Sequence, residues 1–178
     1  MKKTGFIIAA FICFGTLVNA QESALSKNFG FGFQLGQYQK DFGLGINLTS
    51  PYFAGDRIAI RVRGNMMFNE HLSEKTITWT PYSNLSIGVV SVAGEIGNFM
   101  RLYGEGGFLM LFPNSDFSSE SIEMGGYGLF GFEFFFYPKG NYFIEIGGVG
   151  TGATADKVLT NPIYSNGLLI NAGFRFQL

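Results

Sequence analysis

The sequence predicts an all-β protein in which eight antiparallel strands run up and down and close into a barrel. From residue 29 onward, apolar residues alternate with glycine or polar residues at a period of two, which is typical of strands with two different faces. Charged residues make up only 14% of the chain, against about 25% in an ordinary soluble domain. The chain of 178 residues contains 26 Gly and 21 Phe, and its length suits a single domain.

The alternation defines the strands in order. In the runs 29–36 and 42–49, every second residue is Phe, Leu or Ile, and Gly or a polar residue lies between them. The runs 57–68 and 168–178 alternate in a similar way, with Arg and Asn on the polar parity. The middle of the chain is less regular, and we expect strands there at 76–90, 99–112, 122–137 and 142–150.

Four residues in the middle of the chain do not fit the simple alternation. Pro81 falls inside an expected strand, where it would leave a missing hydrogen-bond donor, and we expect a β-bulge there. Leu109 and Leu111 fall on the polar parity, as does Phe135. For the two leucines we expect a slip of the alternation at Gly106-Gly107.

The first twenty residues have the pattern of a secretory signal peptide. Lys2-Lys3 is followed by an apolar run over 6–18 and by a small-residue cleavage site that ends at Ala20. The run is shorter than the roughly 20 residues that a spanning helix needs. We therefore expect residues 1–20 to be cleaved. Cleavage removes Cys13, the only cysteine, and with it any disulfide or thiolate metal site.

Alternation by itself does not say which face of the sheet meets water. In a soluble β-sandwich or a lipocalin-like barrel the apolar face is buried, whereas in a membrane barrel it meets lipid and the polar face lines the lumen. The polar parity here carries many glycines, which suits the crowded interior of an eight-stranded barrel. The sequence therefore predicts a transmembrane β-barrel, with the soluble folds as the alternative.

Aromatic residues and loop lengths agree with this assignment. Aromatics near the strand ends match the girdles of a membrane barrel, with Phe29, Phe99, Phe136, Tyr137, Tyr142 and Phe176 toward one rim and Phe68, Trp79 and Phe112 toward the other. We expect connections at the first rim at 50–56, 91–98 and 138–141. At the other rim, where loops are usually longer, we expect them at 39–41, 69–75, 113–121 and 151–166.

These features resemble the small eight-stranded outer-membrane barrels, of the OmpX-like and OmpA-transmembrane-domain kind. The last run also resembles the C-terminal signal that the barrel-assembly machinery reads, with Phe174 and Phe176 in alternation and Leu178 where the family usually ends in Phe. The resemblance implies a monomer in the outer membrane of a Gram-negative cell, assembled by that machinery and in contact with lipid. Residues 21–28 would then form a short periplasmic segment before the barrel at 29–178.

Seven charged residues fall on the parity that faces the lumen: Arg61, Arg63, Arg101, Glu105, Glu133, Glu145 and Arg175. Their distances from the strand ends predict one belt of Arg101, Glu133, Glu145 and Arg175. Arg61 is expected at a similar height, and Arg63 and Glu105 about one layer higher. A buried charge is costly unless it is paired, so we interpret the set as a structural ion network. An ion-selective constriction is the alternative.

No pattern in the sequence indicates a catalytic, cofactor-binding or metal site. A formal charge of −1 without a basic cluster argues against a nucleic-acid surface. Some small outer-membrane barrels are lipid A-modifying enzymes that use a serine with a histidine base. Here Ser165 has no histidine near it in the chain, and the only histidine, His71, is expected in a solvated loop.

We therefore predict an integral outer-membrane barrel without catalysis, with a structural, surface-interaction or envelope-integrity role. Its outward loops are where we expect an extracellular partner of unknown identity. The first alternative is a narrow pore for ions or small solutes, and the second is a lipid A-modifying enzyme. No cofactor is expected.

Overall fold

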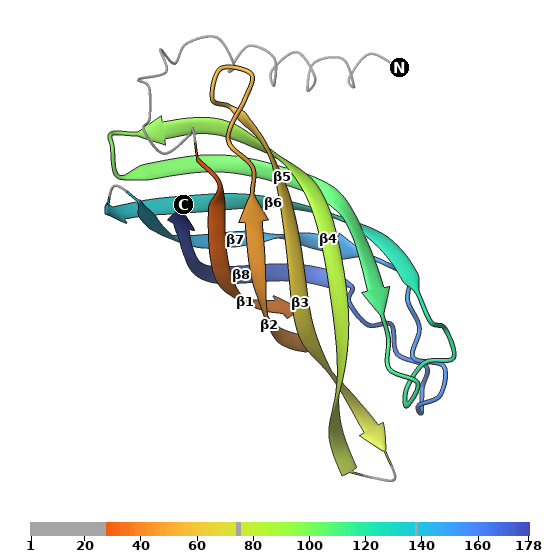
Figure 1. Cartoon of the computed structure of the whole chain (residues 1–178). Coiled ribbons are helices and arrows are strands. Elements are labelled where there is room, and N and C mark those ends of the chain that lie inside the picture. The colour runs from red at the N-terminus through yellow and green to blue at the C-terminus, as the bar shows by residue number, and fades with distance from the viewer. Residues whose placement is uncertain (1–27, 74–75, 138) are drawn as a thin grey trace, which may run out of the picture.

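A computed structural model of the chain describes residues 28–73, 76–137 and 139–178, and the expected signal peptide at 1–20 lies outside them. Each strand pairs antiparallel with the next, and β8 returns to pair with β1, so that the sheet closes (Figure 1). This confirms the predicted eight-stranded up-and-down barrel. Its strands are β1 Gly30–Tyr38, β2 Asp41–Thr49, β3 Ile58–Ser73, β4 Thr76–Ile96, β5 Met100–Phe112, β6 Glu123–Tyr137, β7 Gly140–Gly150 and β8 Gly167–Gln177.

The two parities of the sequence are the two faces of the sheet. On β1, Phe33 and Leu35 point outward and are exposed, while Gln34 between them is buried in the lumen. The same alternation continues around the barrel, because successive side chains of a strand point to opposite faces. Large apolar side chains therefore cover the outside. No helix in the described part of the chain is long and apolar enough to cross a membrane.

Aromatic side chains lie near both ends of the barrel. We call the end where β1 begins and β8 finishes the terminal end, and the opposite end the loop end (Figure 1). At the terminal end, Tyr142 stacks against Phe134 and Phe136, with ring centres 5.0 and 6.2 Å away. The exposed aromatic side chains include Phe29, Phe99, Phe136 and Phe176 at the terminal end and Trp79 and Phe112 toward the loop end.

Two connections expected from the sequence are strand in the structure. β3 and β4 pair residue by residue as far as Ser73 and Thr76, so residues 69–73 of the expected loop at 69–75 are strand. At the terminal end, β4 continues to Ile96, and residues 97–99 replace the expected connection at 91–98. Polar residues suggest loops at both places. The strands nevertheless continue, and the β3–β4 hairpin extends past its neighbours at the loop end (Figure 1).

Pro81 does not produce the expected bulge. It pairs in register with Phe68 on β3, and β5 joins β4 only from Ser83 onward. Pro81 therefore lies where β4 has no second neighbouring strand, so a missing backbone donor is tolerated there. The register shifts lie elsewhere, between Val92 and Gly94 in the β4–β5 pair and between Phe135 and Tyr137 in the β6–β7 pair.

The expected slip at Gly106-Gly107 is also wrong. The register of β5 with β6 is continuous, and Leu109 and Leu111 are buried on the same parity as the inward-facing Glu105. They face the lumen as part of a cluster of buried, mainly apolar side chains nearer the loop end. Phe135 lies 5.3 Å from the guanidinium carbon of Arg101, measured to the ring centre, and so covers a buried cation.

The lumen is crowded enough to require glycine, as the sequence predicts. A Cβ added to Gly107 would lie 2.5 Å from the Cα of Gly88, and one added to Gly173 would lie 2.9 Å from the Cα of Gln34. Atoms do not approach this closely without a shift of the backbone. Inward-facing glycines therefore let neighbouring strands and side chains share the narrow bore.

Candidate functional site

Charged side chains from several strands converge in the lumen toward the terminal end. All seven charged residues expected there are buried, and each lies on the inward parity of its strand. β3 supplies Arg61 and Arg63, β5 supplies Arg101 and Glu105, and β6, β7 and β8 supply Glu133, Glu145 and Arg175 in turn. The barrel thereby brings together residues that are far apart in the sequence.

Two carboxylates lie between the two arginines of β3. Arg61 Nη1 is 2.8 Å from Glu105 Oε2 and 3.3 Å from Glu145 Oε1. Arg63 reaches the same two carboxylates, at 2.5 Å for Glu105 and 2.6 Å for Glu145. Each arginine therefore contacts both acids. The expected upper layer of Arg63 and Glu105 and the lower layer of Arg61 and Glu145 thus form one cluster.

Glu133 connects this cluster to the remaining arginines. It pairs with Arg175, and its carboxylate oxygens lie 3.6 Å from Arg101 Nη1 and 3.5 Å from Arg61 Nη2. Arg175 Nη2 is also 3.7 Å from Glu145 Oε1. The ion pairs therefore link all seven residues into one network, which contains the expected belt.

The sequence prediction missed one acidic member of this network. Glu95 on β4 accepts a hydrogen bond from Arg101 Nε at 2.9 Å and is 2.8 Å from Arg101 Nη2. The sequence pattern predicts a connection at 91–98, whereas in the structure β4 continues to Ile96 and carries Glu95. With Glu95 included, the network contains four arginines and four glutamates, so its formal charges balance.

Neutral side chains satisfy much of what remains. Glu145 accepts hydrogen bonds from Tyr103 Oη at 2.5 Å and from Asn171 Nδ2 at 2.9 Å, and Glu105 accepts one from Tyr127 Oη at 2.7 Å. These donors also lie on inward parities, which was the one signal in the sequence that could have identified them. Aromatic rings cover the cations, and the guanidinium carbon of Arg61 is 5.0 Å from the ring centre of Tyr103.

The charged cluster closes the bore. Arg61 and Glu145 lie in the lumen of the barrel, and both side chains are 0% exposed. Side chains that lined a water-filled channel would be exposed to that water. At this level the interior is therefore packed with paired side chains, as expected for a barrel of eight strands.

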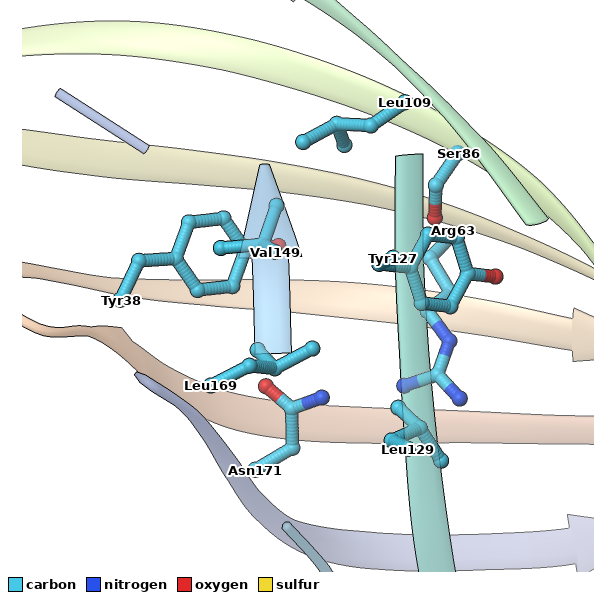
Figure 2. Close-up of a pocket in the computed structure, with 9 residues that line it drawn as sticks. All are labelled: Tyr38, Arg63, Ser86, Leu109, Tyr127, Leu129, Val149, Leu169 and Asn171. Carbon is cyan, nitrogen blue, oxygen red and sulfur yellow. The ribbon is translucent and has the colours of Figure 1, made fainter. Parts of the chain in front are cut away.

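A layer of mainly apolar side chains lies between the charges and the loop end. Leu109, Leu129, Val149 and Leu169 are buried there together with Tyr38. They surround a cavity of about 10 Å³, which Arg63, Ser86, Tyr127 and Asn171 also line (Figure 2). That volume is about enough for one water molecule. The lining comes from seven of the eight strands, so the cavity lies centrally in the lumen.

The connections after β5 and β7 fold over the loop end and form a cap, which we define as residues 113–122 and 151–166. The carboxylate of Asp41 accepts hydrogen bonds from Tyr82 Oη at 2.8 Å and from the backbone N–H of Ser165 at 2.7 Å. The rings of Tyr82, Phe117 and Tyr164 pack edge to face, with centres 5.1 to 5.9 Å apart. The cap is therefore held by a buried carboxylate and an aromatic cluster.

The two halves of the cap also bind each other. Asp156 accepts hydrogen bonds from the backbone N–H and the hydroxyl of Ser119 at 2.7 and 2.5 Å, and Lys157 Nζ donates to the Ser115 carbonyl at 2.8 Å. The hydroxyl of Ser119 and its backbone N–H hold the pKa of Asp156 below its usual value. These contacts tie the two connections into one unit.

The structure changes the description of His71. It is not a solvated loop residue, because it lies in β3, is buried and packs with its ring centre 6.1 Å from that of Phe117. Its Nδ1 faces the Asn69 carbonyl at 3.4 Å. Ser165 is buried too, and its hydroxyl is hydrogen-bonded to Tyr82 at 2.5 Å. Ser165 is therefore paired with Tyr82, whereas His71 packs against Phe117.

We predict that Asp41→Ala loosens the cap. The change removes the acceptor of three hydrogen bonds, which come from Asn69, Tyr82 and Ser165. Hydrogen bonds to charged groups contribute about 1.5–3 kcal/mol, so cleavage by trypsin after exposed Lys157 should become at least about tenfold faster. The folded protein is digested in detergent, and the cut is located by mass spectrometry. Asp116→Ala, at an exposed cap position, is the control and should leave the rate unchanged.

The last strand carries the residues expected to form the assembly signal. Phe174 and Phe176 point outward and are exposed, and the backbone N–H of Leu178 donates to the Phe29 carbonyl at 2.9 Å.

In the part of the chain that the structure describes, no group of three or more His, Cys, Asp and Glu side chains is placed to hold a metal ion.

The fold and the interior together define a class: small, closed, up-and-down barrels of eight strands in which side chains fill the bore. Within this class, the chain is similar to the N-terminal β-barrel domain of Pseudomonas aeruginosa OprF, with a TM-score of 0.59 and 12% sequence identity. The similarity covers 86% of this chain and 98% of that one, and concerns the fold. No protein-family model and no curated protein matches the sequence.

Proposed function

We propose that the protein is an integral outer-membrane β-barrel with a structural, surface-interaction or envelope-integrity role and without catalysis. One observation carries this proposal: the polarity of the barrel is inverted relative to a soluble protein. Exposed Phe, Leu, Ile, Val and Met side chains cover the outer face, while four arginines and four glutamates are paired inside. A soluble barrel of this kind would expose its apolar side to water, whereas in a bilayer that side meets lipid.

Further observations support the same location. Aromatic side chains near both ends of the barrel match the two interfaces of a membrane. Phe174 and Phe176 of β8, with Leu178 just after it, alternate as in the signal read by the machinery that inserts such barrels, which supports assembly by that machinery. The apolar face closes on itself without an unpaired strand along most of its height, which supports a monomer surrounded by lipid.

The first test is gel mobility in SDS before and after boiling. We expect the unheated, detergent-folded protein to migrate faster than the boiled one, because the closed barrel resists SDS and stays compact. After reconstitution into lipid vesicles, the protein should remain in the membrane fraction during carbonate extraction. Identical mobility of the two samples, together with release from the vesicles, would contradict a membrane barrel and favour a soluble fold.

We predict that the purified protein gives no steady conductance in a planar lipid bilayer. The reason is the filled bore, in which Arg61 and Glu145 are fully buried and the central cavity has room for about one water. Reproducible steps of a single size would instead support the alternative of a narrow pore. A known porin in the same bilayer serves as the positive control.

The enzymatic alternative has a separate readout. Overexpression of a lipid A-modifying enzyme shifts the mass of lipid A, whereas we expect no shift with this protein. The buried hydroxyl of Ser165, paired with Tyr82, supports that expectation, because a nucleophile must reach its substrate. A mass shift that disappears in Ser165→Ala would overturn the non-catalytic proposal.

The surface most available to an external partner is the loop end. There the β3–β4 hairpin extends past its neighbours (Figure 1). The side chains of Glu70, Ile77 and Trp79 on this hairpin are exposed. The cap lies beside it, with exposed Asp116 and Lys157. These features support contacts with molecules outside the cell, while the barrel itself serves as the anchor.

A further inference from the structure

A groove crosses the outer face of the barrel wall, separate from the lumen and the cap. It spans β3, β4, β5 and β6 toward the loop end and has a volume of about 420 Å³. Strand register explains its shape. Residues that are partners across neighbouring strands form a row of side chains on the outer face, and two such rows form the walls of the groove.

Both walls are apolar. The first row consists of register partners on β3, β4 and β5, namely Val62, Ile87 and Phe108. The second row lies two residues nearer the loop end and consists of partners on β4, β5 and β6, namely Leu85, Met110 and Met124. Methionine is unbranched and flexible, so this second wall is able to adjust to what lies against it.

The floor of the groove is the backbone between these two rows. Ser86, Leu109 and Gly125 are partners there, and the side chains of Ser86 and Leu109 point into the lumen. Each wall ends where a glycine takes the next position of its row. On β3, Gly64 is the partner of Leu85 in the second row, and on β6, Gly126 is the partner of Phe108 in the first row. The groove is therefore open at both ends.

The packing of the barrel does not explain these two outward glycines. A Cβ on Gly64 would have no atom within 4 Å, and one on Gly126 would have its nearest neighbour at 3.6 Å, an ordinary contact. Glycine weakens a strand, and it often marks a place where a ligand or another backbone approaches closely. Beside Gly126, Phe108 is 78% exposed, the highest fraction among the large apolar side chains of the described residues.

We propose that this groove binds one acyl chain of a membrane lipid, an inference that rests on the proposed location in a membrane. The groove is continuous with the apolar outer face that would contact lipid there. Its two parallel apolar walls and open ends fit a linear, flexible hydrocarbon. Its walls offer no polar side chain to a protein partner, whereas protein interfaces combine an apolar centre with a polar rim.

The test uses a double variant that closes both ends. Gly64→Leu/Gly126→Leu adds two leucines where the barrel has room for them, and Ala172→Leu adds one at an exposed outward position of β8 as the matched control. Dipalmitoyl phosphatidylglycerol is added to the full barrel in detergent, and bound lipid is measured by native mass spectrometry. Excluding about two methylene groups should weaken binding about tenfold in the double variant, with no change in the control.

Equal lipid affinity in all three proteins would overturn the proposal, and so would weaker binding in the control. A dimer that only the double variant loses would assign the groove to a second copy of the chain instead. Gel mobility before boiling verifies that each variant is folded. If only the lipid result fails, the outer-membrane proposal remains, whereas identical heated and unheated mobility of the original protein would remove both.

Discussion

Replacing Glu145 with alanine is expected to lower the free energy of unfolding by about 3–5 kcal/mol, because the buried network is then left with one uncompensated positive charge. Glu145 is 0% exposed and lies within 3.3 Å of Arg61 and 2.6 Å of Arg63. It also accepts hydrogen bonds from Tyr103 and Asn171.

The measurement is unfolding in urea of the protein in lipid vesicles, followed by the fluorescence of Trp79, the only tryptophan. Glu95→Ala is the matched comparison, since Glu95 is partly exposed and, among the described residues, its ion pair is with Arg101. It should cost less than Glu145→Ala, because water reaches the Glu95 side of this pair and Glu133 still faces Arg101. We expect Glu133→Ala and Arg101→Ala to lower the stability as well. If Glu145→Ala were as stable as Glu95→Ala, the network would have no structural role.

Gly147→Val is expected to prevent formation of the barrel. Gly147 faces the lumen, and its added Cβ would lie 2.6 Å from the Cβ of Leu129, with backbone atoms of the neighbouring strand as close. Because these atoms belong to a closed sheet, neither strand moves without breaking other hydrogen bonds. Overpacking of this kind costs about 3 kcal/mol or more.

The next residue supplies the control. Gly148 faces outward, and a Cβ there would have its nearest neighbour, the Gly167 carbonyl oxygen, at 3.7 Å. Gly148→Val should therefore fold, since valine also favours strands. The fraction of each variant that migrates as the compact, unheated form in SDS is the readout. Similar folding of both variants would show that crowding in the lumen does not select glycine.

The secondary structure could be predicted from the sequence because alternate residues of a strand lie on opposite faces of the sheet. The regular runs of β1, β2 and β8 were placed to within two residues, and the seven charged residues on the inward parity are buried in the structure. The ends of β3 and β4 were less predictable. Polar residues near a barrel rim occur in strands and loops alike, so Asn69 and Glu95 looked like loop residues.

The structure of the irregular positions depends on strand pairing, which the pattern along the chain does not reveal. Leu109 and Leu111 suggested a slip because we expected a uniformly polar lumen, whereas its interior changes from charged to apolar along the axis. Pro81 suggested a bulge because a closed sheet has no free edge. The hairpin of β3 and β4, however, extends beyond β5, and only the pairing of strands reveals where a neighbour ends.

The sequence by itself determined that the chain alternates between two chemically different faces, and therefore that it forms strands rather than helices. Local chemistry suffices for this, because strand periodicity is a property of neighbouring residues. Only the tertiary structure decided which arginine meets which glutamate, that Asp41 holds Ser165 of the cap, and that His71 is buried. Those contacts join residues far apart in the chain, and their distances depend on strand register and barrel closure.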